Sequence, residues 1–361
     1  MNFTMNTSEI ILPFNKEKKV SWRSPSNIAL VKYWGKKENQ IPSNPSLSFT
    51  LSESYTETSI FYKKKEYLNA ASLEFRFEGK KNLPFQNKID GFLKKITEYF
   101  PFLTELQLKI DSRNSFPHSA GIASSASSMS ALALCLCSIE KKHFGSLNDK
   151  DEFFTKASFI ARLGSGSASR SVFPYAATWG EIIENSISSD EFSSLLPFEL
   201  NPKFKNYKDA ILIISKQVKK ISSTAGHALM VGHPFAKERF ILAKKNLKLL
   251  LSALKSGDEK SFIEIVENEA LTLHALMMSS NPGFILIHPN TLKIIEKVRD
   301  YREKTGIKLC FTLDAGPNIH LLYSDNDSDE VEKYIKKELV QYCENEFWIS
   351  DKMGEGPMEI L

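Results

Sequence analysis

The sequence predicts an α+β fold built from two domains. The chain has 361 residues, of which 42% are hydrophobic, which is enough for a full core and for more than one domain. Strand-like alternation and helical periodicity run through the first 200 residues, and the pattern restarts after a loop rich in Ser, Asp and Pro. We therefore expect an N-terminal extension over 1–20, a first domain over 21–200 and a second over 201–361.

The individual elements follow from hydrophobic period and turn residues. In the first domain we expect strands at 48–51, 56–62, 73–77 and 106–111, and helices at 87–99, 125–143 and 150–163. In the second we expect strands at 209–215, 308–313 and 319–323, and helices at 234–254, 260–278, 289–304 and 328–343. No internal repeat or extended low-complexity tract interrupts this order.

Composition and charge exclude several classes of function. The 47 basic and 43 acidic residues give a net charge of +4, which is too small for a nucleic-acid-binding surface. The first twenty residues lack a basic start followed by an apolar core, and no apolar run reaches membrane-spanning length. Four cysteines in mostly apolar contexts fit reduced thiols, and the seven histidines show no short metal-ligand spacing. We expect a cytoplasmic protein with a small-molecule substrate, and no nucleic acid or membrane as partner.

Residues 164–171 read Gly-Ser-Gly-Ser-Ala-Ser-Arg-Ser, which is seven small residues around one guanidinium. Small side chains let a ligand approach the backbone closely, and Arg170 offers a planar pair of donors suited to carboxylate or phosphate. A flexible linker is the alternative, but an apolar-periodic helix precedes the segment and Val172 and Phe173 follow it. We interpret 164–171 as an anion-binding loop.

A second small-residue loop, 119–128, runs directly into an Ala- and Leu-rich segment that predicts a helix. Ser124 or Ser125 falls at the first turn, so backbone N–H groups and the positive helix end would face the loop. A serine cap on a buried helix explains one serine but not five within ten residues. The loop is therefore expected to bind phosphate, although the chain has neither a Walker lysine loop nor a complete dinucleotide fingerprint.

Three charged residues have settings typical of functional groups. Lys36 ends a mostly apolar segment, Asp314 follows a predicted strand and precedes a Gly-Pro turn, and Arg170 lies in the first small-residue loop. Each also has a structural explanation. Asp314 would be a turn cap, Lys36 a surface lysine and Arg170 one half of an ion pair.

Together these segments resemble the diphosphomevalonate decarboxylases of the galactokinase, homoserine kinase, mevalonate kinase and phosphomevalonate kinase (GHMP) superfamily. The motifs that carry the resemblance, between about residues 21 and 325, are 27–36, 45–51, 116–126, 164–171, 218–226 and 312–318. The resemblance implies a two-domain GHMP-kinase-like fold with the active site in the cleft between the domains, usually in a homodimer. It also implies conversion of mevalonate 5-diphosphate and ATP to isopentenyl diphosphate, ADP, phosphate and carbon dioxide, a step of isoprenoid biosynthesis.

Matched positions imply roles for individual residues. Asp314 would orient or deprotonate the tertiary hydroxyl, Arg170 would hold the carboxylate, and Lys36 would support the developing charge. The implied substrate-binding residues are Tyr33, Trp34, Gly35, Lys36, Lys88, Ser165, Gly166, Ser167, Ala168, Ser169, Arg170, Ser223 and Thr224. The implied nucleotide loop is Ala120, Gly121, Ile122, Ala123, Ser124 and Ser125, with Mg²⁺ bridging ATP oxygens and Ser124 or Ser125 as its only candidate protein ligands.

Several positions depart from the family pattern. His118 and Ile122 stand where better-known members have Thr and Leu, Ser169 replaces a common cysteine, and Pro174-Tyr175 replaces a glycine pair. Lys88 aligns with an arginine that some members place on the diphosphate, and lysine lacks the bidentate fork. Two alternatives therefore remain, a decarboxylase of mevalonate 5-phosphate and a kinase of the 3-hydroxyl group.

Overall fold

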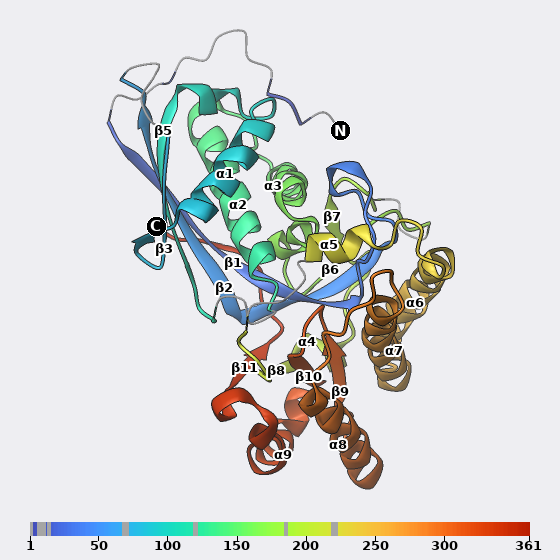
Figure 1. The fold of residues 1–361 in the computed structure, drawn as a ribbon. Coiled ribbons are helices and arrows are strands. Elements are labelled where there is room, and N and C mark those ends of the chain that lie inside the picture. The colour runs from blue at the N-terminus through green and yellow to red at the C-terminus, as the bar shows by residue number, and fades with distance from the viewer. Residues whose placement is uncertain are drawn as a thin grey trace.

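The computed structural model describes residues 3–5, 12, 16–66, 72–117, 122–183, 187–217 and 223–361, with the side chain of Ser223 outside this description. It confirms the α+β class: helices pack against two separate sheets (Figure 1). Among the described residues, no helix is both long enough and apolar enough to cross a membrane.

The larger sheet has eight strands. Its main path runs β12-β1-β2-β5-β3-β4, and β6 and β7 extend it from β2. All pairs are antiparallel except β3 with β5. The strands are β1 (Lys18–Val31), β2 (Ser46–Lys64), β3 (Leu73–Phe77), β4 (Lys80–Lys81), β5 (Leu106–Asn114), β6 (Ala176–Trp179), β7 (Ser193–Leu195) and β12 (Met358–Glu359).

Three helices lie together over this sheet: α1 (Leu83–Lys95), α2 (Ser124–Phe144) and α3 (Lys150–Gly164) (Figure 1). Almost every residue of α2 from Met129 to Glu140 is buried. Its Ala, Leu, Cys and Ser side chains are small enough to pack on all sides, which is typical of a helix inside a core. The helix begins at Ser124, as its sequence predicts. Ala123 and Ser125, at its N-terminal end, line the same cavity as Asp314.

The smaller sheet is antiparallel, in the order β11-β8-β10-β9. Its strands are β8 (Lys208–Leu212), β9 (Cys310–Leu313), β10 (Ile319–Tyr323) and β11 (Trp348–Lys352). The helices in this half of the chain are α4 (Pro202–Lys205), α5 (Ser223–Ala228), α6 (Ala236–Ser256), α7 (Glu259–Met278), α8 (Pro289–Thr305) and α9 (Ser328–Tyr334). Helices α6 and α7 form a long pair beside the sheet, and α8 and α9 lie at the far end of the molecule (Figure 1).

Some predicted boundaries were wrong. The expected strands 48–51 and 56–62 are parts of one long strand, β2. Helix α1 begins at Leu83, because Asn82 caps it by accepting a hydrogen bond from the N–H of Phe85. The last helix ends at Tyr334 and continues as a π-helical turn over Ile335–Leu339 and a 3₁₀ turn over Val340–Tyr342.

The C-terminal segment connects the two sheets. The carboxylate of Asp351, at β11, accepts backbone hydrogen bonds from Ser52, Glu53 and Ser54 of β2 at 2.8–2.9 Å. Further along, β12 pairs with β1. These contacts fix the smaller sheet against the larger one, and the end of β1 and the turn after β9 line the same cavity between them.

Candidate active site

One cavity of about 310 Å³ brings together segments that are far apart in the sequence. It is lined from the end of β1, the start of α2, the loop after α3, helix α5, helix α7 and the turn after β9. The sequence-predicted residues that line it are Tyr33, Trp34, Lys36, Lys88, Ala123, Ser125, Ser165, Gly166, Ser167, Arg170, Thr224 and Asp314. The motifs that the sequence analysis singled out therefore converge on one place.

Arg170 is a buried cation that donates hydrogen bonds to neutral side chains. Its side chain donates from Nε to Ser48 Oγ at 2.8 Å, from Nη1 to Ser46 Oγ at 2.6 Å and from Nη2 to Asn27 Oδ1 at 3.4 Å. Within the described residues no carboxylate forms an ion pair with it, which argues against the structural ion pair as its explanation. Burial lowers the pKa of Arg170 to about 10, and the charge of Asp314 opposes this shift. The guanidinium therefore stays charged at neutral pH and faces the cavity as an anion-binding group.

The loop after α3 is a 3₁₀ helix over Gly166–Val172, and its small residues have two different uses. A Cβ on Gly166 would lie 2.8–2.9 Å from the rings of Trp179 and Tyr33, so only glycine fits there. Ser165, Gly166 and Ser167 line the cavity. Ala168 and Ser169 are fully buried and do not line it, because Ser169 Oγ bonds to the carbonyl of Gly166 and to Ser193. The structure therefore does not bring these last two to the site.

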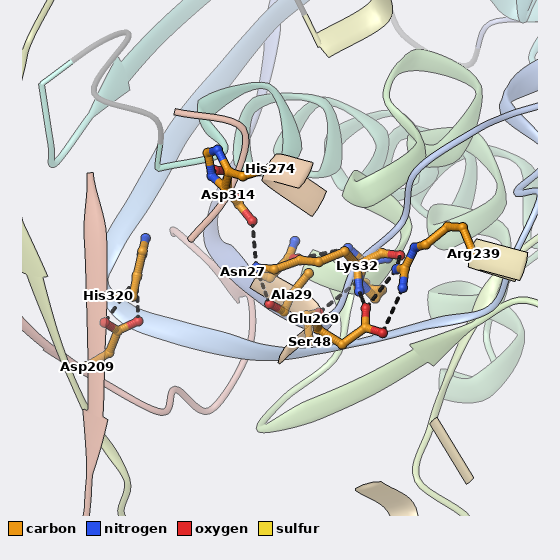
Figure 2. Close-up of polar contacts among 11 residues, drawn as sticks. Asn27, Ala29, Lys32, Ser48, Asp209, Arg239, Glu269, His274, Asp314 and His320 are labelled. Carbon is orange, nitrogen blue, oxygen red and sulfur yellow. Dashed lines mark hydrogen bonds and ion pairs between the residues drawn. The ribbon is translucent and has the colours of Figure 1, made fainter. Parts of the chain in front are cut away.

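Asp314 contacts a lysine that the sequence analysis missed. Lys32 Nζ lies 3.1 Å from Asp314 Oδ1 and donates to the carbonyl of Ala29 at 2.5 Å (Figure 2). The Lys32 side chain is only 2% exposed, and burial lowers its pKa, while the charge of Asp314 raises it. The signal was present, because Lys32 interrupts an otherwise apolar run that ends in Tyr-Trp-Gly-Lys. A charge inside such a run indicates a buried, paired group.

A second buried ion pair holds the backbone of Lys32. Arg239 on α6 and Glu269 on α7 form a bidentate pair, with Nη1–Oε1 at 2.8 Å and Nη2–Oε2 at 2.7 Å. Glu269 Oε2 accepts from the N–H of Lys32 at 2.9 Å, and Arg239 Nη2 donates to the Lys32 carbonyl at 3.0 Å (Figure 2). Both groups of the Lys32 peptide backbone are thus fixed by helices that accompany the smaller sheet.

Lys36 occupies a different part of the same cavity. Its Nζ donates to Gln40 Oε1 at 2.9 Å, and burial followed by the charge of Lys95 lowers its pKa. Tyr33 and Trp34 line the cavity beside it, whereas Gly35 does not. Gly35 has φ +93°, and a Cβ there would meet the ring of Phe240 at 3.1 Å. Its part is to turn the chain between Lys32 and Lys36.

A second cavity, of about 430 Å³, lies at the start of α2. Phenylalanine rings of β3 and α1 form its apolar wall, and Ser124, Ser125 and Ser128 line it from α2. It shares Lys88, Ser125 and Gly164 with the first cavity. Of the expected nucleotide loop, Ala120 and Gly121 lie outside the described residues. Ile122 is buried in the core and lines neither cavity.

The described residues include no group of three or more His, Cys, Asp or Glu side chains that could hold a metal ion. A metal at this site would therefore depend chiefly on the oxygens of a bound ligand. Two buried cations around one carboxylate, next to a helix N-terminus, define an enzyme site for anionic small molecules.

Comparisons with known proteins agree with an enzyme site for anionic small molecules. Residues 24–190 match the family model of the diphosphomevalonate decarboxylase-like N-terminal domain. Residues 210–357 match the model of the mevalonate 5-diphosphate decarboxylase C-terminal domain. A diphosphomevalonate decarboxylase from Gibberella zeae is 30% identical over 336 residues, which are 86% of this chain and 82% of that protein.

Solved structures are similar over nearly the whole chain. Mevalonate diphosphate decarboxylase from Staphylococcus aureus has a TM-score of 0.81 at 28% identity, covering 96% of this chain and 99% of that one. The enzyme from Legionella pneumophila has a TM-score of 0.75 at 30% identity, covering 91% and 99%. The chain belongs to the diphosphomevalonate decarboxylase family, as its sequence motifs predicted.

Proposed function

We propose that this enzyme decarboxylates mevalonate 5-diphosphate at the expense of ATP, giving isopentenyl diphosphate, ADP, phosphate and carbon dioxide. The observation that carries the proposal is the grouping of Lys32, Asp314 and Arg170 in one cavity. A solved relative, MDDEF, with 28% identity and a TM-score of 0.80, was determined in complex with MVAPP, AMPPCP and magnesium. We infer that this chain binds the corresponding substrates, ATP and Mg²⁺.

Asp314 and Lys32 are assigned to the tertiary hydroxyl. A tertiary hydroxyl is a poor nucleophile, so it must be oriented and relieved of its proton as it attacks the γ-phosphate of ATP. Asp314 supplies the acceptor, and Lys32 beside it favours the ionised carboxylate. We assign to Lys32 the support of developing charge that the sequence analysis gave to Lys36.

Arg170 is assigned to the substrate carboxylate. Loss of the 3-phosphate leaves positive character at the carbon, and the neighbouring carboxylate must be aligned for its C–C bond to break. The Arg170 guanidinium is already fixed by Ser46, Ser48 and Asn27 before any substrate arrives. We expect most of the rate enhancement to come from preorganised charge of this kind.

ATP is assigned to the second cavity and the start of α2. The phenylalanine-lined wall suits the nucleotide base, and the first-turn N–H groups of α2 suit its phosphates. Mg²⁺ would neutralise phosphate charge there, held by ATP oxygens with Ser124 or Ser125 as candidate protein ligands. Ser125 and Lys88 line both cavities, so the two substrates would meet beside them.

We also propose a cytoplasmic homodimer. All four cysteines, at 135, 137, 310 and 343, are buried and free, which fits a reducing compartment. The dimer rests on the family resemblance alone, and light scattering of the purified protein tests it.

The reaction is tested by counting carbon dioxide per ADP with two substrates. Purified protein, ATP and Mg²⁺ are supplied with either mevalonate 5-diphosphate or mevalonate 5-phosphate. We expect matched release of carbon dioxide and ADP with the diphosphate. ADP without carbon dioxide would identify a kinase of the 3-hydroxyl group, and matched release with only the monophosphate would identify the other decarboxylase.

A further inference from the structure

His227 on α5 lines the substrate cavity, although none of the sequence motifs assigned it a role. The ring lies between two aromatic side chains, with centroids 4.3 Å from Tyr33 and 4.6 Å from Trp34. The residue is only 7% exposed. A polar ring held this tightly at a cavity wall has a fixed orientation.

One ring nitrogen of His227 is used by the protein. Nδ1 lies 3.0 Å from the backbone nitrogen of Gly35 and accepts its N–H. A nitrogen that accepts a hydrogen bond carries no proton in the neutral ring, so the proton lies on Nε2. Burial, followed by the charge of Lys36, lowers the pKa of His227 to about 3. The ring is therefore a neutral Nε2–H donor throughout the physiological range.

The other nitrogen has no such use. Among the described residues, none accepts a hydrogen bond from Nε2. Because the residue lines the cavity, a ligand bound there can accept a hydrogen bond from this N–H.

We propose that His227 Nε2–H donates to a phosphate oxygen of the substrate and contributes to recognition of its phosphorylated end. The inference rests on the proposed function, since it concerns how the same cavity holds the same substrate. Lys36, Lys88 and Gln40 line this cavity too, and the two lysines supply positive charge. His227 adds a directed donor without a third cation, which fixes the phosphate group while leaving the total charge of the site unchanged.

The side chains of Asn and Gln separate the two ring nitrogens experimentally. In His227→Asn, the amide oxygen can take the place of Nδ1 and keep the bond from Gly35 N–H, but no donor replaces Nε2–H. In His227→Gln, the longer side chain can place an amide N–H near the position of Nε2. Asn is therefore the test variant and Gln the matched control.

Binding of mevalonate 5-diphosphate is measured by calorimetry for the wild type and both variants, without ATP. We expect His227→Asn to weaken binding at least about tenfold, the usual scale of a hydrogen bond to a charged group, while His227→Gln stays within about threefold. In turnover assays KM should rise for His227→Asn with kcat nearly unchanged, because the bond is made equally in ground and transition states. An ATP analogue should bind all three proteins alike.

Three outcomes would overturn the inference. The first is wild-type affinity in His227→Asn. The second is an equal loss of affinity in both variants together with a lowered melting temperature, which would show that the ring only packs in the core. The third is a wild-type protein that does not bind mevalonate 5-diphosphate at all. This last result would remove the proposed function as well, whereas the first two would leave it standing.

Discussion

The two ends of the substrate cavity are built differently. At one end Lys32 and Arg170 are almost fully buried, and hydrogen bonds from several segments fix them before a substrate binds. At the other end Lys36 and Lys88 are more exposed, and the ammonium group of Lys36 donates a hydrogen bond to the side chain of Gln40. Under the proposed function, the charges that act on the reacting bonds would be fixed in advance, whereas those that bind phosphate could adjust to it.

We expect the largest change in stability when the buried ion pair between Arg239 and Glu269 is broken. Arg239→Met should lower the free energy of unfolding by about 3–5 kcal/mol, because it leaves the charge of Glu269 buried and unpaired. Chemical denaturation measures this loss. The double variant with Glu269→Leu removes both charges and should recover much of the stability. Failure of the double variant to recover any would show that the pair is not a coupled unit.

Asp314→Asn should abolish most turnover while leaving the fold intact. The amide keeps the shape of the carboxylate but cannot accept the hydroxyl proton, so kcat should fall on the order of a hundredfold or more. Binding of an ATP analogue should be unchanged and serves as the control. Near wild-type turnover would remove Asp314 from the reaction.

Arg170→Lys should cost about tenfold or more in kcat/KM. Lysine keeps the charge but loses the planar fork that Ser46 and Ser48 hold in place. Steady-state kinetics with varied mevalonate 5-diphosphate measure this loss, and ATP affinity should change little. If the variant matches the wild type, Arg170 is a source of charge only and its fixed geometry has no catalytic value.

The smallest expected effect is a pH dependence of stability at the phosphate end. His227 has a folded pKa of about 3 and an ordinary unfolded value near 6.5, so the unfolded chain binds its proton first. Stability from this group is therefore present above pH 6.5 and is lost as pH falls toward 3. Between pH 7 and 5.5 the loss should be about 1 kcal/mol. The His227→Asn variant should lack this part of the decline in denaturation curves at the two pH values, and an identical decline would contradict the assigned pKa.

Much of the site could be predicted from the sequence because the clearest signals are local. Arg170 stands alone among small residues, Asp314 sits between a strand and a Gly-Pro turn, and Ser124 starts an Ala-rich helix. Each signal lies within ten residues. The family motifs then placed these segments in order, and the structure brings them to two adjoining cavities.

Strand β1 and the role of Lys32 could not be predicted because they depend on contacts between distant segments. Strand β1 was missed because Ser24, Ser26 and Asn27 look like loop residues. Only the structure shows that they are buried and hydrogen-bonded to segments 96 to 144 residues away. The choice between Lys32 and Lys36 likewise depends on which one reaches Asp314, some 280 residues further along the chain.

Substitution of each of the two lysines shows which of them supports the reacting groups. Lys32→Gln and Lys36→Gln are assayed side by side for kcat and for KM of mevalonate 5-diphosphate, with binding of an ATP analogue as the control for folding. We expect Lys32→Gln to lower kcat on the order of a hundredfold, and Lys36→Gln mainly to raise KM. A Lys32→Gln enzyme that keeps its kcat, with the loss of turnover in Lys36→Gln instead, would show that Lys36 and not Lys32 supports the reacting groups.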